Sequence, residues 1–540
     1  MLSRRKTHTH IAGSRCFVTL ILLTLFVPYH RDVRAEDKDE VFRTLLQRIE
    51  QLEQDNKQLK NRVEDLEGRE PSGASESEVF PPVGSASLLE EPRSLRIADE
   101  PHPATVDAES TGGKAFADDL SETDSLQDQR IAELDKTVKS LTEKASKKTY
   151  PTLTVNGVFQ ADAGWITQDD ISKAEYGNIQ DGADFRRARL SAKGSVTETT
   201  NYFFQMDFGF FGRPTFTDVW LEQTQVPLLG NVRIGQWKQP FSLEVVSSFR
   251  YTTFMERSLL FQPFTPFRHI GAGFYDASES LDMTWAASVF RTGQDQFGGS
   301  LSTDGGWGTS ERLTFLPLWE CNGTEYLHLG AGHFFNSPPS DTINFRTIPE
   351  FFIGANGPGA VGTSGQAVPG GSNGTPFFVS TGNLTVPAYN VLGSELLWVN
   401  GPFSLQSEAM VNFVNVSGAD TAVLPGAYAQ AGYFLTGEHR PYDRKTGAID
   451  RVMPKTNLCF GGTNCNPGFG AWEVAARWSW LDLNDSVVAG GTITDYTAGL
   501  NWYWNPYTKM VFNYVHAVSD TPAFPESHTD MFGLRAQIDF

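Results

Sequence analysis

The sequence predicts an all-β fold: an antiparallel transmembrane β-barrel over residues 150–540, preceded by an N-terminal α-helical coiled-coil segment. Three observations predict it. Segments of about ten residues alternate apolar and polar side chains, and tryptophan and tyrosine lie at their ends, where the surfaces of a membrane would be. No apolar run reaches the roughly 20 residues that a membrane helix needs. Counting such segments predicts about 16 strands, an even number as in outer-membrane barrels.

The final segment of the chain shows the alternation most clearly. One face carries Phe532, Leu534, Ala536, Ile538 and Phe540, and the other carries Gly533, Arg535, Gln537 and Asp539. Segments 202–208, 474–480 and 496–504 repeat the pattern. A soluble β-sandwich would alternate similarly. A last strand that ends on an aromatic residue favours a closed barrel, because closure leaves no free edge in the membrane.

The charge distribution narrows the classes of function. The chain has a net charge of −20, with −6 in residues 1–149 and −14 in residues 150–540. Neither part has the basic excess of a nucleic-acid-binding protein, so we expect no nucleic-acid partner. We find no Gly-x-Ser-x-Gly motif, phosphate-binding loop or metal-ligand spacing. The sequence therefore predicts a protein that is not an enzyme and needs no cofactor or metal.

The first 149 residues divide into four predicted parts. Residues 1–35 have the basic start, short apolar stretch and small-residue cleavage site of a signal peptide. Residues 36–68 contain heptads typical of a coiled coil, and an amphipathic surface helix is the alternative. Residues 69–118 form an acidic linker rich in proline and serine, which we expect to be disordered. Residues 119–149 carry a second, shorter heptad pattern and are interpreted as a helical stalk.

The heptads favour self-association. Three g-to-e pairs of opposite charge accompany the core, and an asparagine in that core would fix the register. The predicted core residues are Leu45, Ile49, Leu52, Asn56, Leu59, Val63 and Leu66. In the barrel region Cys459 and Cys465 flank a short loop, so a disulfide between them fits a compartment outside the cytoplasm.

A row of cations provides the candidate functional residues. Arg187, Arg189 and Lys193 share one face of a predicted strand, and facing lipid would cost about 2–4 kcal/mol for each near the membrane centre. We therefore expect them to face a water-filled lumen and attract anions. The same alternation along their strands places four more arginines on the lumen-facing side: Arg233, Arg312, Arg477 and Arg535. The alternative is ordinary lumen lining, with arginines paired to Asp207, Glu222 or Glu408.

Three segments do not read as regular strands. Residues 241–270 are apolar and carry Arg250, Arg257 and Arg268, so we expect them to fold back into the barrel and narrow it. An extra strand pair or a subunit contact is the alternative. Residues 337–387 and 438–469, rich in glycine, proline, serine and asparagine, are predicted to be long external loops.

Several motifs in order resemble the phosphate-selective porin O/P family of bacterial outer-membrane porins. They are FRRARLSAKGSV, VRIGQWKQPFSLE, SSFRYTTFMERSL, ARWSWLDLND, TAGLNWYWNPYTKMVFNYV and GLRAQIDF, and the resemblance covers about residues 150–540. It implies a 16-stranded trimeric porin whose third loop folds inward. Arg187 and Arg189 match the family's strand motif, Lys238 matches a GQ-aromatic-Lys motif, and Arg250 and Arg257 match the inward loop.

The resemblance implies a passive channel in outer-membrane lipid for small anions such as phosphate, or for other small polar solutes. The expected assembly is a homotrimer with its N-terminal stalk in the periplasm. An alternative is a tether that holds the membrane to the cell wall through the coiled coil and has a non-selective pore. The net charge of −14 in residues 150–540 leaves phosphate, general anion and cation preference open.

Overall fold

The computed structural model describes residue 136 and residues 149–209, 214–292, 306–353, 375–461 and 466–540. The predicted signal peptide, coiled coil, linker and stalk lie outside the described residues, apart from positions 136 and 149. Those four assignments therefore stay predictions. Within the described part of the chain, no helix has both the length and the apolar character needed to cross a membrane.

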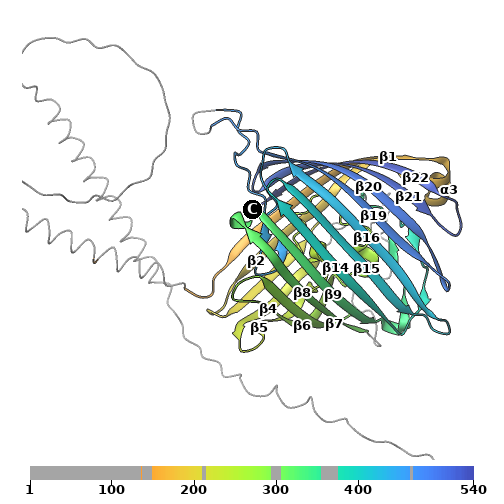
Figure 1. Ribbon diagram of the computed structural model, residues 1–540, viewed down its shortest axis with the longest axis horizontal. Coiled ribbons are helices and arrows are strands. Elements are labelled where there is room, and N and C mark those ends of the chain that lie inside the picture. The colour runs from red at the N-terminus through yellow and green to blue at the C-terminus, as the bar shows by residue number, and fades with distance from the viewer. Residues whose placement is uncertain (1–135, 137–148, 210–213, 293–305, 354–374, 462–465) are drawn as a thin grey trace, which may run out of the picture. The chain divides into compact units, whose positions relative to one another are not determined.

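Sixteen antiparallel strands form one closed barrel, in which each strand pairs with its neighbours along the chain (Figure 1). This confirms the predicted fold class and strand number. The strands are β1 (Thr154–Gln168), β2 (Gly182–Ser195), β3 (Thr200–Asp207), β4 (Thr215–Val226), β5 (Gly230–Lys238), β6 (Arg268–Ala277), β7 (Met283–Arg291), β8 (Trp307–Glu320), β9 (Glu325–Ser337), β14 (Ala388–Asn400), β15 (Phe403–Asn415), β16 (Thr421–Phe434), β19 (Ala471–Asp485), β20 (Val488–Asn505), β21 (Thr508–Asp520) and β22 (Ser527–Asp539).

The remaining elements are short and lie in the connections. The helices are α3 (Asp170–Tyr176), α4 (Leu243–Val246) and α5 (Phe261–Phe264), with 3-10 turns at η1 (Cys321–Gly323) and η2 (Pro339–Asp341). Three two-stranded sheets pair β10 (Thr342–Ile343) with β13 (Leu384–Thr385), β11 (Arg346–Thr347) with β12 (Val379–Ser380), and β17 (Tyr442–Asp443) with β18 (Ala448–Ile449).

The period-two pattern determines which side chains face outward. On β22 the apolar residues Phe532 and Ile538 are exposed on the outer surface, whereas Arg535 and Gln537 are buried inside. An exterior of apolar side chains suits lipid, and the polar set must then line the interior. The predicted parity of the terminal strand is confirmed.

The first and last strands close the barrel. Phe540 exchanges two backbone hydrogen bonds with Gly157, and its ring lies where a side chain at Gly157 would project. Further along the seam, Arg535 lies opposite Asp162 in register and forms an ion pair with it at 2.6 Å. The seam is therefore held by backbone pairing, by aromatic packing on the outside and by a charge pair on the inside.

The two ends of the barrel differ. Mostly short connections lie at the end where β1 begins and β22 ends, which we call the turn end. The opposite loop end carries residues 239–267, 338–353 and 375–387. Because strand directions alternate, residues 435–470, between β16 and β19, lie at the turn end. The prediction that 337–387 and 438–469 are both external loops was therefore wrong, because the two segments lie at opposite ends.

Among the described residues, three long connections send side chains into the barrel. We call them the inner loop (239–267), the upper loop (338–353 and 375–387) and the lower segment (435–461 and 466–470). Phe241 and Leu259 of the inner loop and Phe351 of the upper loop are almost fully buried in an apolar cluster. The same cluster includes Leu424 of β16 and Val515 of β21 from the inner face of the wall. Much of the lumen is thus packed.

We expect the replacement Arg535→Met to lower the free energy of unfolding by about 3–5 kcal/mol, because it leaves one buried carboxylate without a cation and removes one of the two cations of a second. Those carboxylates are Asp162 and Glu256, each ion-paired to Arg535. Denaturant unfolding of the barrel in lipid vesicles measures the change. Arg291→Met, at an exposed arginine on β7, is the control. A loss no larger than that of the control would contradict the structural role of this pair.

Candidate functional site

The inner loop enters the barrel because the wall makes room for it. Gly332 of β9 and Gly393 of β14 lie opposite each other on the inner face. The ring of Phe241 packs against both, and a Cβ atom at either glycine would approach that ring to about 3 Å. Small residues at two paired positions thus create the recess that receives the first apolar side chain of the loop.

Opposite charges hold the two ends of α4. The Glu408 carboxylate accepts the backbone N–H groups of Leu243 and Glu244 at the start of the helix. At the other end, Lys238 Nζ donates to the carbonyls of Val245, Val246 and Ser247 at 2.7–2.9 Å. Both contacts follow the helix dipole. All three N–H groups of Lys238 are therefore engaged, although its positive charge has no carboxylate partner within the described residues.

A β-bulge turns two consecutive arginines toward the lumen. The register between β1 and β2 shifts so that Gln160 pairs with Arg187 while Ala161 pairs with Phe185. Arg186 therefore also points inward, where it forms a bidentate ion pair with Glu256 of the inner loop at 2.8 and 2.9 Å. Strict alternation placed Arg186 on the outer face, so sequence reasoning missed it.

Arg187 and Arg189 lie inside the barrel, as predicted, and share one aromatic neighbour. Their guanidinium carbons lie 4.6 and 4.5 Å from the centre of the Phe249 ring in the inner loop. Arg189 pairs with Asp207 at 2.7 Å. Arg187 donates to Gln160 at 2.7 Å but forms no ion pair within the described residues. The lumen therefore holds a buried cation whose charge is not neutralised locally.

Arg257 of the inner loop resembles Arg187 in this respect. Its guanidinium donates to the backbone carbonyls of Glu244 and Ser247 and forms no ion pair among the described residues. Burial lowers the pKa of Arg257 to about 10; Glu244 opposes that shift, whereas the nearby charges of Arg268 and Arg189 add to it. Cations crowd this part of the lumen, and an anion among them would relieve their mutual repulsion.

Most of the other predicted arginines form ion pairs with carboxylates. Arg233 pairs with Glu222 at 2.6 Å, Arg268 with Asp218 at 2.7 Å, and Arg312 with Glu395 at 2.7 Å. Arg250 approaches Asp539 at 3.5 Å. The anticipated pairs with Asp207 and Glu222 thus form, whereas Glu408 binds α4 instead. Lys193 is exposed on β2, near the turn end.

Two further arginines anchor the loops. Arg477 of β19 bridges Glu350 of the upper loop, at 2.5 Å, and Glu244 of the inner loop, at 3.2 Å. Arg535 binds Glu256 at 2.9 Å as well as Asp162. Carboxylates neutralise both charges, so Arg477 and Arg535 hold the inner and upper loops in place inside the barrel. Alternation along the strands located both arginines but could not reveal these partners, because Glu244, Glu256 and Glu350 come from distant loops and Asp162 from the first strand.

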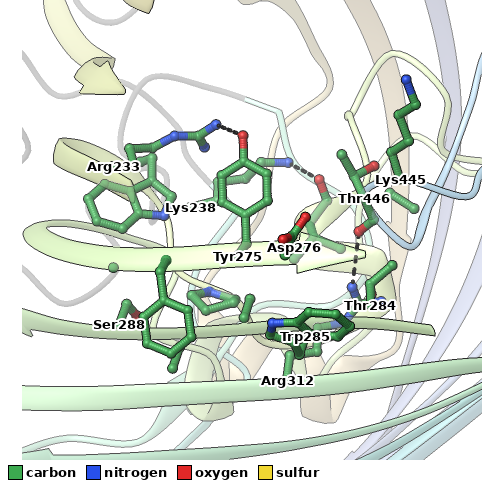
Figure 2. Close-up of a pocket in the computed structure, with 18 of the residues that line it drawn as sticks. Arg233, Lys238, Tyr275, Asp276, Thr284, Trp285, Ser288, Arg312, Lys445 and Thr446 are labelled. Carbon is green, nitrogen blue, oxygen red and sulfur yellow. Dashed lines mark hydrogen bonds between the residues drawn. The ribbon is translucent and has the colours of Figure 1, made fainter. Parts of the chain in front are cut away.

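A cavity of about 250 Å³ lies on the turn-end side of the inner loop. Strands β5–β8 form the wall of this cavity. Val246 of the inner loop and Lys238, the last residue of β5, border it on one side. Lys445 and Thr446 reach it from the lower segment (Figure 2). Arg312 also lines it and binds the carbonyls of Thr446 and Gly447. The cavity therefore adjoins the part of the wall that carries Arg233, Lys238 and Arg312.

The remaining candidate ligands, possible metal-binding side chains and cysteines, form no binding site among the described residues. Among the described residues, no group of three or more His, Cys, Asp or Glu side chains could hold a metal ion. Cys459 is disulfide-bonded. Cys465, its predicted partner, lies outside the described residues, and the exposed Cys321 is a free thiol.

The comparisons with known proteins agree with this geometry. Residues 153–540 match the model of the family "Phosphate-selective porin O and P". The chain belongs to this family. It is 26% identical over 397 residues to Porin O of Pseudomonas aeruginosa, which covers 68% of this chain and 85% of that protein. This porin is therefore an outer-membrane channel for small anions, and its family consists of channel proteins rather than enzymes.

Solved structures of other porins are also similar to it. The trimer form of OmpT from Vibrio cholerae aligns with a TM-score of 0.43 and 9% identity, covering 73% of this porin and 100% of that chain. An anion-selective porin from Comamonas acidovorans aligns with a TM-score of 0.41 and 10% identity, covering 72% and 100%.

The replacement Glu256→Gln should destabilise the porin at neutral pH and destabilise it less at pH 3. Burial tends to raise the pKa of Glu256, but Arg186, Arg535 and Arg187 outweigh it and hold the pKa below its usual range. The ionised carboxylate therefore stabilises the fold above the unfolded pKa of about 4.3, and this contribution disappears as pH falls through the lower folded value. Unfolding of both proteins at pH 7 and pH 3 measures it. If the two proteins differed in free energy of unfolding by the same amount at both pH values, the result would contradict a role for the charge of Glu256.

Proposed function

We propose that small anions, phosphate among them, diffuse through this porin along the side of the lumen formed by β2–β6. The observation that carries this proposal is a group of three cations without carboxylate partners among the described residues: Arg187, Lys238 and Arg257. Each comes from β2, β5 or the inner loop. A row of positive charge in a narrow aqueous path attracts anions and repels cations.

Packing supports an off-centre path. The apolar cluster joins the inner and upper loops to the inner faces of β7, β9, β14–β16 and β19–β22 and, among the described residues, contains none of β2–β6. Ions do not cross such close-packed apolar regions, because they would lose their hydration. At the turn end, the cavity adjoins β5–β8, and Arg440 of the lower segment binds Glu473 and Thr253 on the other side. The remaining route follows the wall that carries the unpaired cations.

The acidic balance of the chain does not oppose an anion path. Exposed charges act only over a Debye length of about 8 Å in physiological salt. Buried charges in a medium of low dielectric are screened far less. Arg187 is 5% exposed, and the acidic residues closest to it are already paired. The local excess of positive charge therefore outweighs the net charge of −20.

The replacement Arg187→Gln should lower anion preference without unfolding the barrel, because it leaves no carboxylate unpaired. We expect the chloride-to-potassium permeability ratio to fall about threefold to tenfold, as loss of about 1 kcal/mol of attraction would give. The reversal potential of the purified porin in planar bilayers under a KCl gradient measures it. Arg291→Gln is the matched control, since Arg291 is exposed on β7.

Phosphate added to the same bilayers should reduce the chloride current, and this block should weaken in the Arg187→Gln porin. A wild-type porin that prefers potassium would contradict the proposed function, and would assign control to the acidic residues. A ratio unchanged by Arg187→Gln would remove Arg187 from the path.

The homotrimer is also part of this proposal, and family membership supports it. Three subunits with one lumen each should give conductance that closes in three equal steps when channels gate together. Crosslinking of the porin in membranes, followed by mass measurement, tests the same point. A monomeric species as the sole product would contradict the trimer.

A further inference from the structure

The cavity at the turn-end side has features that attraction of inorganic phosphate alone does not explain. Its volume of about 250 Å³ lies just below the roughly 300–1,000 Å³ of pockets that hold drug-sized ligands. It is bordered by three separate parts of the chain: the wall, the inner loop and the lower segment. A space of this size suits a small organic molecule better than a single inorganic ion.

Hydroxyl groups line the wall of the cavity. Ser288 is 7% exposed, and its Oγ has no hydrogen-bond partner within the described part of the chain. Tyr275 OH donates to Glu222 and accepts from Arg233, and the Thr284 hydroxyl is hydrogen-bonded to Thr314 at 2.6 Å. A buried hydroxyl without a partner costs free energy unless something hydrogen-bonds to it. Ser288 is therefore the side chain that a bound hydroxyl group would satisfy.

A cation, Lys445, lies at the opposite side of the same space, where Asp276 also lines the cavity. The backbone N–H of Lys445 donates to the Asp443 carboxylate. Lys445 is exposed, and its ammonium has no hydrogen-bond or ion-pair partner among the described residues. Figure 2 shows Lys445 and Thr446 together on one side of the cavity, with Ser288 on the other side beyond Tyr275. The lower segment is held in this position by Arg312, which binds the carbonyl of Gly447 at 2.7 Å.

We propose that this cavity is a second subsite of the path, and that it binds phosphate monoesters of small polyols. The phosphoryl group would pair with the Lys445 ammonium, and the polyol hydroxyls would reach Ser288. The Thr446 hydroxyl takes no part, because it donates to Asp443 at 2.7 Å. This inference rests on the proposed anion channel and names a substrate class for it. Inorganic phosphate would use the cationic end alone, so the monoester should bind more tightly.

The test measures block of the chloride current of the full-length porin in planar bilayers by three probes: glycerol 3-phosphate, inorganic phosphate and glycerol. We expect glycerol 3-phosphate to block at lower concentration than inorganic phosphate, and glycerol to have no effect. Ser288→Ala should raise the half-blocking concentration of the ester about threefold or more, as loss of one hydrogen bond gives, and leave block by inorganic phosphate unchanged. That variant leaves no partner unsatisfied, so folding should be preserved.

Lys445→Gln should weaken block by both anions, because both use the cationic end, while Lys173→Gln is the matched control. Lys173 is an exposed lysine on α3, at the other end of the barrel. Equal block by ester and inorganic phosphate in the wild-type porin, or an ester block that Ser288→Ala leaves unchanged, would overturn the subsite while the anion channel stands. Loss of chloride preference in the wild-type porin would instead overturn the proposed function.

Discussion

Much of the interior depends on how Arg535 is neutralised. Its guanidinium bonds Asp162 across the closing seam, Glu256 of the inner loop and the carbonyl of Met255. Isolating a charge in this interior would cost several kcal/mol, so the partners must be brought to it. The strand that closes the barrel therefore also fixes the middle of the inner loop. Glu256 in turn binds Arg186, which joins that loop to β2.

The same constraint separates two kinds of arginine in the lumen. Arg312, Arg477 and Arg535 face carboxylates at close distance and are almost fully buried, so each holds one of the inward segments. Arg187 and Arg257 bind neutral oxygens instead. Sequence parity cannot distinguish these kinds, because every one of these residues is simply an inward arginine. The distinction depends on where the carboxylates lie, and most of those belong to loops.

The sequence was sufficient to predict the barrel and its orientation of side chains. Period-two alternation in strands such as β22 is local, and it identified sixteen strands and the inward position of Arg189 and Arg477. The resemblance to the family was confirmed by the match over residues 153–540. Alternation does not predict irregular positions within a strand, and one residue was missed for this reason. The bulge on β2 inverts parity at one residue, and Arg186 was missed for that reason.

The loops required long-range information. Residues 337–387 and 438–469 share a composition rich in glycine and proline, yet they connect strands at opposite ends of the barrel, and side chains from the described parts of both reach inward. Only an exact strand count gives the end at which a connection lies. Their inward course depends on pairs such as Arg477 with Glu350, 127 residues apart, and Arg440 with Glu473.

These pairs also explain why an acidic chain can guide anions. Many carboxylates of the interior are ion-paired, either with arginines of neighbouring strands or where they hold the inner loop, upper loop and lower segment against the wall, so they contribute little free negative charge to the path. Arg187, Lys238 and Arg257 lie on the side that the packed apolar cluster leaves open. Net charge counts all ionised groups equally. Selectivity depends on the few groups that remain unpaired where the path is narrow.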